Sequence, residues 1–493
     1  METSARALSQ PLPVPWLAGR ARSLPQQPFL SLRTLVPLVA LHAVLGVTAF
    51  LVPGIATFHG YATLAVGLYL VGRPGSSLRA FYVAAYMASA DVFWRMTKAA
   101  VPWEYCKYAV VLLVLLIAVR RPVRVGLAQW ASLYFFLLLP SVVETIQYFG
   151  VTDLLRKELS FNLSGPFALA AIVFLCSGLE GEFPDLGRLL GWMLMPIVSA
   201  FAIAFYSTVT ASTLIFRNQA NFATSGGYGP NQVSAVLGLG AFFCLLLALN
   251  THGRPLRIFL LGLGAVLLLQ TLLTFSRGGA FNMVVASILL SLHYIRRPRA
   301  RRVLLGTLIV GGALAFYLVL PRLNEWTSGS FSARFTNIDT TGRKSLAEAD
   351  LRLFEDNVLM GVGAGMSKYE RTNAFRQGIA SHTEFTRLLA EHGLLGLLAF
   401  GILLLIGYQA YRLAPTVLAK GWVASLIGWS MAEMAHSAMR IAAISFVFGI
   451  ATFAFHRATP PGAGAGEALP EPAPRPRFDR FRAAAARLGG GRA

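Results

Sequence analysis

The chain has 493 residues, of which 55% are hydrophobic and only 13% are charged, and its formal net charge at pH 7 is +21. Soluble globular proteins carry roughly 25% charged residues, so this composition excludes an ordinary soluble enzyme. The three cysteines, Cys106, Cys176 and Cys244, are too few and too scattered for a disulfide framework or a zinc site to organise the fold.

Apolar runs recur along most of the chain, and each is long enough to cross roughly 30 Å of hydrocarbon as a helix. We therefore expect an all-α polytopic integral membrane protein with about 12–14 transmembrane helices. The predicted helices span 32–53, 55–72, 78–97, 103–119, 126–149, 161–178, 187–210, 231–250, 257–275, 279–295, 303–320, 384–411, 419–436 and 440–456.

The two ends of the chain are polar. Residues 1–31 carry proline and arginine, and the apolar run that follows them is too long for the core of a signal peptide. We expect 1–31 to be a cytoplasmic segment and 32–210 to be a first set of transmembrane helices. The tail, 457–493, is rich in Ala, Pro, Gly and Arg, which predicts a disordered basic cytoplasmic segment.

Basic loops set the expected orientation. The cluster "RRPRARR" at 296–302 predicts a cytoplasmic loop, because short cytoplasmic loops carry an excess of Lys and Arg. Alternating outward from it places on the same side both termini, "RRPVR" at 120–124, Arg254 with Arg257, and Arg412 with Lys420. These loops and anionic lipid account for the positive charge, and we expect no nucleic-acid partner because no basic domain interleaved with aromatic residues is present.

The opposite face carries the segment 211–230 and one long insertion, 321–383, which is predicted to be a loop with one short amphipathic helix at "LAEADLRLF". An anionic substrate would explain cations on this face, but long loops cross the membrane regardless of charge, so both interpretations stay open. The cations of the insertion are Arg322, Arg334, Arg343, Lys344, Arg352, Lys368, Arg371 and Arg376.

Arg277 lies in "TFSRGGAF", 274–281, between two predicted helices. Gly278 and Gly279 predict a tight turn with positive φ and a close backbone approach. The arginine either extends to the interface from a helix end or binds a phosphate through two parallel hydrogen bonds.

Two further segments predict groups at the same face. In "GGYGPNQ", 226–232, Pro230 in the first turn and Asn231 as the cap indicate a helix N-terminus. Such an end is able to hold an anion, or it is an ordinary loop-to-helix junction. In "SHTEFTRLLAEHG", 381–393, His382 is a candidate general base on the same segment as Glu391, although a lone interfacial histidine is often a hydrogen-bonded spectator. By composition alone, His392 is nearly as available.

Several motifs of other functions are missing from the sequence. There is no phosphate-binding loop of an ATP motor, and no Asp-x-Asp pair that would hold a metal-bound nucleotide sugar. Glu433 and His436 have the spacing of a di-iron pair, but no second pair accompanies them. We therefore expect neither a metal nor a cofactor.

Taken together, these segments resemble the bacterial O-antigen ligase/O-antigen polymerase family. "TFSRGGAF", "TGRKSLAEADLRLFEDNVLMGVGAGM" and "SHTEFTRLLAEHGLLGLL" follow one another in the family's order, and "GYGPNQVSAVL" is similar to its upstream Gly-Pro-Asn segment. The likeness covers roughly 211–410, which indicates an O-antigen ligase-like transmembrane region at 211–456 that includes one large periplasmic loop, 321–383. The first 200 residues resemble the family only in that they are predicted to form hydrophobic helices.

The resemblance implies a metal-independent, GT-C-like glycosyltransferase of the bacterial inner membrane. Members take glycan from an undecaprenyl-pyrophosphate carrier and transfer it to an acceptor sugar hydroxyl at the periplasmic face. The acceptor is lipid A-core for ligases, and a second lipid-linked glycan for polymerases of O-antigen or exopolysaccharide. The sequence does not separate these two.

The resemblance also implies roles for particular residues. Arg217, Arg277 and Arg343 match the arginines that bind the donor's pyrophosphate, and His382 matches the proposed base. Asn231 and Glu391 are expected to support them. Thr383 departs from the family, in which many members have Asn after the histidine.

Two other functions remain possible from the sequence. A flippase of lipid-linked glycans would line a path through the bundle with charges, and Asp91 in an apolar stretch is a candidate for such a group. A non-catalytic component of a polysaccharide assembly complex would need neither the arginines nor the histidine.

Overall fold

A computed structural model describes residues 31–119, 126–181, 183–251, 253–337, 342–371 and 378–455. The predictions on 1–30, the basic cluster 120–124, Arg376 and the tail 457–493 lie outside these residues.

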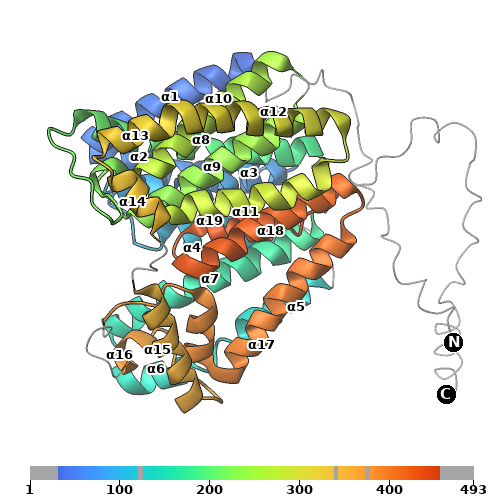
Figure 1. The fold of residues 1–493 in the computed structure, drawn as a ribbon. Coiled ribbons are helices and arrows are strands. Elements are labelled where there is room, and N and C mark those ends of the chain that lie inside the picture. Colours follow the sequence, from blue (N-terminus) through green and yellow to red (C-terminus); the bar gives the residue numbers. More distant parts are fainter. Residues whose placement is uncertain are drawn as a thin grey trace, which may run out of the picture. The chain divides into compact units, whose positions relative to one another are not determined.

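The described chain is helical almost throughout (Figure 1). Two strands of two residues, β1 (Glu180–Gly181) and β2 (Ala454–Phe455), pair in parallel. The helices are α1 (Leu32–Leu51), α2 (Pro53–Gly72), α3 (Ser77–Met96), α4 (Tyr105–Ala118), α5 (Leu127–Phe136), α6 (Val142–Phe149), α7 (Asp153–Gly178), α8 (Phe183–Thr210), η1 (Ala223–Ser225), α9 (Pro230–Asn250), α10 (Arg254–Leu273), α11 (Arg277–Tyr294), α12 (Pro298–Leu314), η2 (Ala315–Val319), α13 (Leu320–Trp326), α14 (Ser330–Thr336), α15 (Arg343–Asp356), α16 (Ser367–Glu370), α17 (Glu384–Leu413), α18 (Val417–Ser437) and α19 (Ala442–Ile450).

Eight helical spans among the described residues are long and apolar enough to cross a membrane, which confirms a multi-pass membrane protein. The count is below the predicted twelve to fourteen. The helices α4, α5 and α19 are short, and α3, α11 and α18 carry polar residues within them. The eight spans are Leu32–Leu51, Pro53–Gly72, Asp153–Gly178, Asp185–Thr210, Pro230–Asn250, Arg254–Leu273, Pro298–Trp326 and Glu384–Leu413.

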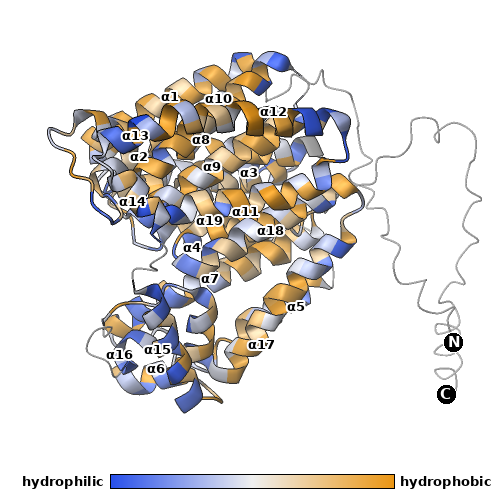
Figure 2. Ribbon diagram, viewed as in Figure 1, coloured by the Kyte–Doolittle hydropathy of each residue, from blue (hydrophilic) through white to orange (hydrophobic). Residues whose placement is uncertain are grey.

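Basic residues from three separate loops meet at one end of the bundle. Arg257 and Arg299 both donate to the carbonyl oxygen of Thr251, at 3.0 and 2.6 Å. The Lys420 ammonium lies 5.4 Å from the centre of the Tyr411 ring, beside the α17–α18 turn. Figure 2 shows this polar end as blue at the start of α12, against the orange of the bundle helices. The basic clusters that the sequence predicts on one side of the membrane therefore lie at the same end of the bundle.

The helices α9, α11 and α17 begin at the other end of the bundle, where α10 ends. The insertion 321–383, predicted as a loop with one short helix, contains α14, α15, α16 and most of α13. In Figure 1, α15, α16 and α6 gather beside the first turns of α17.

One predicted helix, 126–149, is wrong. It is two helices, α5 and α6, separated by a turn at 137–141 that contains Pro140. Proline has no backbone N–H and clashes with the preceding helical turn, so the chain bends there. The bend brings Ser141 against α17, where its hydroxyl lies 2.6 Å from Nδ1 of His392.

Helix α17 is kinked at Gly393, whose φ of 60° is accessible to glycine at little cost. The segment that follows α15 fills the kink: the N–H of Val362 donates to Ala390 at 2.9 Å, and that of Leu394 donates to Val358 at 2.7 Å. The glycine-rich stretch "GVGAG" therefore docks the first part of α17 and holds its N-terminus in place.

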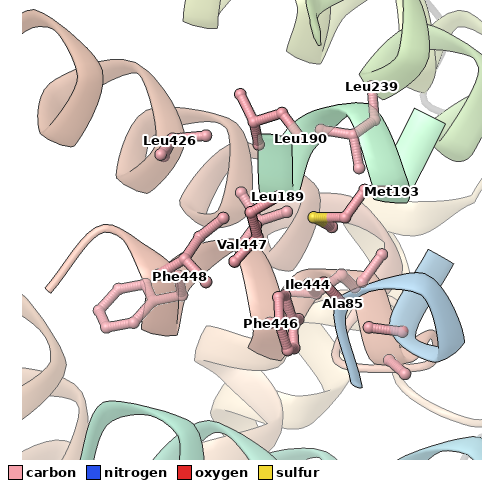
Figure 3. Packing of buried hydrophobic residues seen from close by; sticks show 14 of the residues in the cluster. Ala85, Leu189, Leu190, Met193, Leu239, Leu426, Ile444, Phe446, Val447 and Phe448 are labelled. Atoms are coloured by element: carbon pink, nitrogen blue, oxygen red, sulfur yellow. The ribbon is translucent and has the colours of Figure 1, made fainter. Parts of the chain in front are cut away.

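The main core lies among α3, α7, α8, α9, α18 and α19. Figure 3 shows Phe446 and Ile444 of α19 near Ala85 of α3 and Met193 of α8. The buried Asp91 pairs with Arg95 at 2.9 Å and accepts the N–H of Ala442, at the start of α19, at 3.0 Å. It is therefore a helix-paired carboxylate.

Candidate active site

A cavity of about 180 Å³ lies where the helix N-termini gather. Its described walls include three side chains that bear or accept positive charge and no carboxylate. The lining residues are Gln219, Ala220, Asn231, Arg334, Gly342, Arg343, Leu346, Ile379 and His382.

The beginnings of three helices contribute to this wall. Asn231 is the second residue of α9, Arg343 is the first residue of α15, and His382 lies two residues before α17. A helix N-terminus presents unpaired N–H groups and a partial positive charge, which favours anions. Asn231 is thus inside its helix, not at the cap position that the sequence predicted; Gly229 holds that position.

A fourth helix start, that of α11, is joined to the wall. The hydroxyl of Ser276 donates to Oδ1 of Asn231 at 2.8 Å, or accepts from its amide if the assigned oxygen and nitrogen are exchanged. Arg277, the first residue of α11, is half-buried, and its Nη1 donates to the carbonyl of Asn337 at the end of α14. Arg277 therefore lies beside the cavity, next to its lining residue Asn231.

The two glycines after Arg277 have a packing role. They lie inside α11 and not at positive φ, so the predicted turn geometry is wrong; the positive φ, 56°, is at Phe275. The predicted close approach is present, because a Cβ on Gly279 would lie 1.9 Å from the carbonyl oxygen of Ser234 in α9. Glycine lets α11 press against α9, which brings Arg277 to Asn231.

Arg343 is held in an unfavourable electrostatic environment. Burial lowers the pKa of its guanidinium; Glu433 opposes this effect, and the charge of Arg277 adds to it. The repulsion shows that Arg277 and Arg343 are close enough to interact. A bound anion would relieve both the repulsion and the desolvation.

His382 has the geometry of a base. Its Nδ1 lies 3.1 Å from the carbonyl oxygen of Ala380, which can only accept, so Nδ1 carries the proton and the lone pair is on Nε2. Burial, followed by the charges of Arg440 and Arg343, lowers the pKa of His382 to about 4. The imidazole is therefore neutral at pH 7 and able to accept a proton.

Arg334 is a cavity residue that sequence reasoning did not single out. It is only 6% exposed, and it donates to the carbonyls of Phe275 at 2.9 Å and Asn218 at 3.3 Å. It thus joins α14 to the loop before α9 and to the start of α11. Nothing in the local pattern distinguishes it from the other cations of the insertion.

Arg217 and Glu391 do not line this cavity. Arg217 is exposed, two residues before the lining residue Gln219, so its role stays a prediction. Glu391 is buried beside a smaller cavity of about 20 Å³, where it accepts from Arg387 at 2.7 Å and from Ser367 at 2.8 Å.

Arg440, between α18 and α19, is a further residue near His382 that the sequence did not predict. Its Nη2 donates to the carbonyl oxygen of Ser381 at 2.6 Å, next to His382. Its separation in sequence from the motif, 59 residues, leaves no local pattern that would indicate the contact.

The departure at Thr383 has a structural explanation. Its hydroxyl accepts from the N–H groups of Phe385 and Thr386, at 3.2 and 3.5 Å, and so caps α17. Thr and Asn are both favoured at this position, so the substitution preserves the cap.

Among the residues that the structure describes, no group of three or more His, Cys, Asp or Glu side chains is arranged to hold a metal ion. The ionisable side chains on the described walls of the cavity are two guanidinium groups and an imidazole.

A family model described as "O-Antigen ligase" matches residues 263–401. The match extends from within α10 into α17 and contains Arg277, Arg343, His382 and Glu391, whereas Arg217 and Asn231 precede it. No curated protein matches the chain. Residues 263–401 are therefore similar to the O-antigen ligase family, and the family resemblance is confirmed over this stretch.

Proposed function

We propose that the protein is a glycosyltransferase that moves glycan from an undecaprenyl-pyrophosphate carrier to an acceptor sugar hydroxyl, as an O-antigen ligase or an O-antigen or exopolysaccharide polymerase. The observation that carries the proposal is the cavity itself. Arg343, Arg334 and His382 line it, Arg277 lies beside it, and no carboxylate is among its described walls. Such a site favours a multiply charged anion.

The proposed reaction is a displacement at the anomeric carbon. The acceptor oxygen bonds to that carbon as the bond from the carbon to the pyrophosphate oxygen breaks. Nε2 of His382 takes the proton of the acceptor hydroxyl, and the carrier pyrophosphate departs as an anion. Arg343 and Arg277, with the helix N-termini, stabilise the charge that develops on the leaving group. Lipid A-core or a second lipid-linked glycan serves as acceptor.

The site belongs at the periplasmic face of the inner membrane in this proposal. The basic loops around Arg257, Arg299 and Lys420 meet at the opposite end of the bundle, and short basic loops favour the cytoplasm. The catalysis needs no metal in this scheme, because arginine side chains supply the positive charge.

A flippase is less well supported. Its predicted intramembrane charge, Asp91, is engaged by Arg95 of the same helix and by the N-terminus of α19, and so holds α3 and α19 together. No observation on the described residues favours a transport path.

Reconstitution tests the proposal. Purified full-length protein, supplied with undecaprenyl-pyrophosphate-linked glycan and lipid A-core, should release undecaprenyl pyrophosphate and form glycosylated lipid A-core or longer lipid-linked chains. A deletion strain separates the two activities: single repeats on lipid A-core indicate a polymerase, and long carrier-linked chains missing from lipid A-core indicate a ligase. Absence of both products with active donor would contradict the proposal.

A further inference from the structure

A buried ion pair lies behind His382, outside the cavity. Asp350 of α15 and Arg371, which follows α16, are both fully buried in their side chains. Oδ1 of Asp350 accepts from Nε of Arg371 at 3.0 Å and from its Nη2 at 2.5 Å, which is a two-pronged pair. Burying two charges carries a desolvation penalty that can exceed their attraction, so a buried ion pair is weak evidence for a role in stability alone.

The guanidinium of Arg371 also holds the backbone segment that leads to His382. Its Nη1 donates to the carbonyl of Ile379, and its Nη2 donates to the hydroxyl of Ser381 at 2.6 Å. The carbonyl of Ser381 in turn accepts from Arg440 at 2.6 Å. Residues on both sides of Ala380 are thus anchored by arginines.

Ala380, which lies between the anchored residues, sets the tautomer of the His382 imidazole. Its carbonyl oxygen accepts from Nδ1 of His382, and this contact leaves the lone pair on Nε2. Were the Ala380 carbonyl free to rotate, Nδ1 would lose its fixed acceptor and the tautomer would no longer be selected.

The same pair connects the imidazole to the arginine of the cavity. Arg343, Leu346 and Asp350 share one face of α15, at the spacing of three and four residues. Arg343 and Leu346 line the cavity, whereas Oδ2 of Asp350 accepts from the hydroxyl of Thr386 in α17 at 3.0 Å. One face of α15 therefore contacts both the cavity and the start of α17.

We propose that Asp350 and Arg371 are positioning residues that fix the tautomer of His382 and its distance from Arg343. Neither side chain lines the cavity; both act through the backbone at 379–381 and through α15. The consequence for transfer rests on the proposed function, but the geometric statement does not.

The test measures the reaction of diethyl pyrocarbonate with His382 in the full-length protein, followed by mass spectrometry across a pH series. The reagent modifies neutral imidazole. Asp350→Asn removes the charge and keeps the shape, and Arg371→Lys keeps the charge and loses the fork. We expect both to raise the modification rate of His382 roughly ten-fold, since a charge-assisted contact to the segment is lost.

Two internal controls accompany the variants. Glu348→Gln removes an exposed carboxylate of the same helix, 3.9 Å from Lys344, and should leave His382 unchanged. His392 is fully buried in α17 and should stay unreactive in every variant. The proposal would be overturned if His382 were modified in Asp350→Asn and Arg371→Lys at the same rate as in Glu348→Gln. A parallel rise at His392 would also overturn it, because the pair would then hold the fold as a whole.

Glycan transfer is measured separately in the same variants. Loss of transfer with a raised His382 rate is the expected result. If His382→Ala transfers normally while Asp350→Asn still exposes His382, the proposed function fails and the positioning role stands. If His382→Ala is inactive but Asp350→Asn keeps the wild-type rate and pH profile, the positioning role fails and the proposed function stands.

Discussion

Two groups of buried charge in this protein differ in their balance. Between α3 and α4, Arg95 pairs with Asp91 at 2.9 Å and Lys107 pairs with Glu104 at 2.7 Å, with all four side chains at most 7% exposed. That network contains two acids and two bases. By contrast, Arg334, Arg343 and His382 line the cavity, and no carboxylate is among its described walls.

The difference separates structure from function. The balanced network leaves no net charge to be neutralised, and Asp91 also accepts the N–H of Ala442, so it fastens helices together. The cavity concentrates positive charge in a place where burial and repulsion already lower the pKa of Arg343. In the proposed function, only the second arrangement is stabilised by a bound anion.

The largest expected effect follows from removing the base. His382→Ala should lower the transfer rate about 10²- to 10⁴-fold, because the acceptor hydroxyl loses its proton acceptor. Protein amount in the membrane should not change. His293→Ala, a histidine at the opposite end of α11 bonded to Tyr411, is the matched control and should transfer normally. Full activity of His382→Ala would end the base assignment.

The next effect concerns the cationic wall. Arg343→Ala should lower transfer about 10²-fold, since a stabilising charge on the leaving group is lost. Arg343→Lys should recover part of this, because a point charge remains without the fork. Arg352→Ala, exposed on the same helix, should be unaffected. Equal transfer rates for Arg343→Ala and Arg352→Ala would contradict the role of Arg343, because an arginine at the cavity would then matter no more than an exposed one.

A substitution in the balanced network should have the opposite pattern. Asp91→Asn leaves Arg95 without its nearest carboxylate, and we expect a loss of about 3 kcal/mol in the free energy of unfolding. Thermal unfolding in detergent measures the loss. Transfer per folded molecule should be unchanged, and a variant that folds normally but no longer transfers would place Asp91 in the function instead.

The smallest effect is a pH shift. The lowered pKa of His382, about 4, keeps the imidazole neutral at higher pH, so kcat/KM should hold from pH 7 to about pH 5 and fall as pH drops through about 4. An ordinary histidine would lose activity near pH 6.5. Bound donor brings negative charge to the site, so the kcat profile should fall at higher pH than the kcat/KM profile. Coincident profiles near pH 6.5 would contradict the described environment.

Much of the fold could be predicted from the sequence because lipid allows few alternatives. Apolar runs located the bundle helices to within a few residues for α1, α2, α9 and α18. The prediction failed at Pro140, where hydrophobicity alone joined two helices, and in 321–383, where short helices packed on one another lack a long apolar run.

The candidate site was predictable only in part. Asn231, Arg343 and His382 lie in segments that have a local pattern, and the structure brings them to one cavity. Arg334 and Arg440 are defined by contacts with distant backbone carbonyls, at Phe275 and Ser381, which no local pattern reports. The glycines after Arg277 were recognised, but their purpose was the contact with α9 and not a turn.

The central claim is that the cavity binds a lipid diphosphate through Arg343. The most direct measurement is calorimetric binding of farnesyl diphosphate, a short polyprenyl diphosphate, to full-length protein in lipid nanodiscs. We predict saturable binding to the wild type and to Arg352→Ala, and binding at least roughly ten-fold weaker to Arg343→Ala. Equal affinity in all three proteins, or no binding to the wild type, would contradict the account.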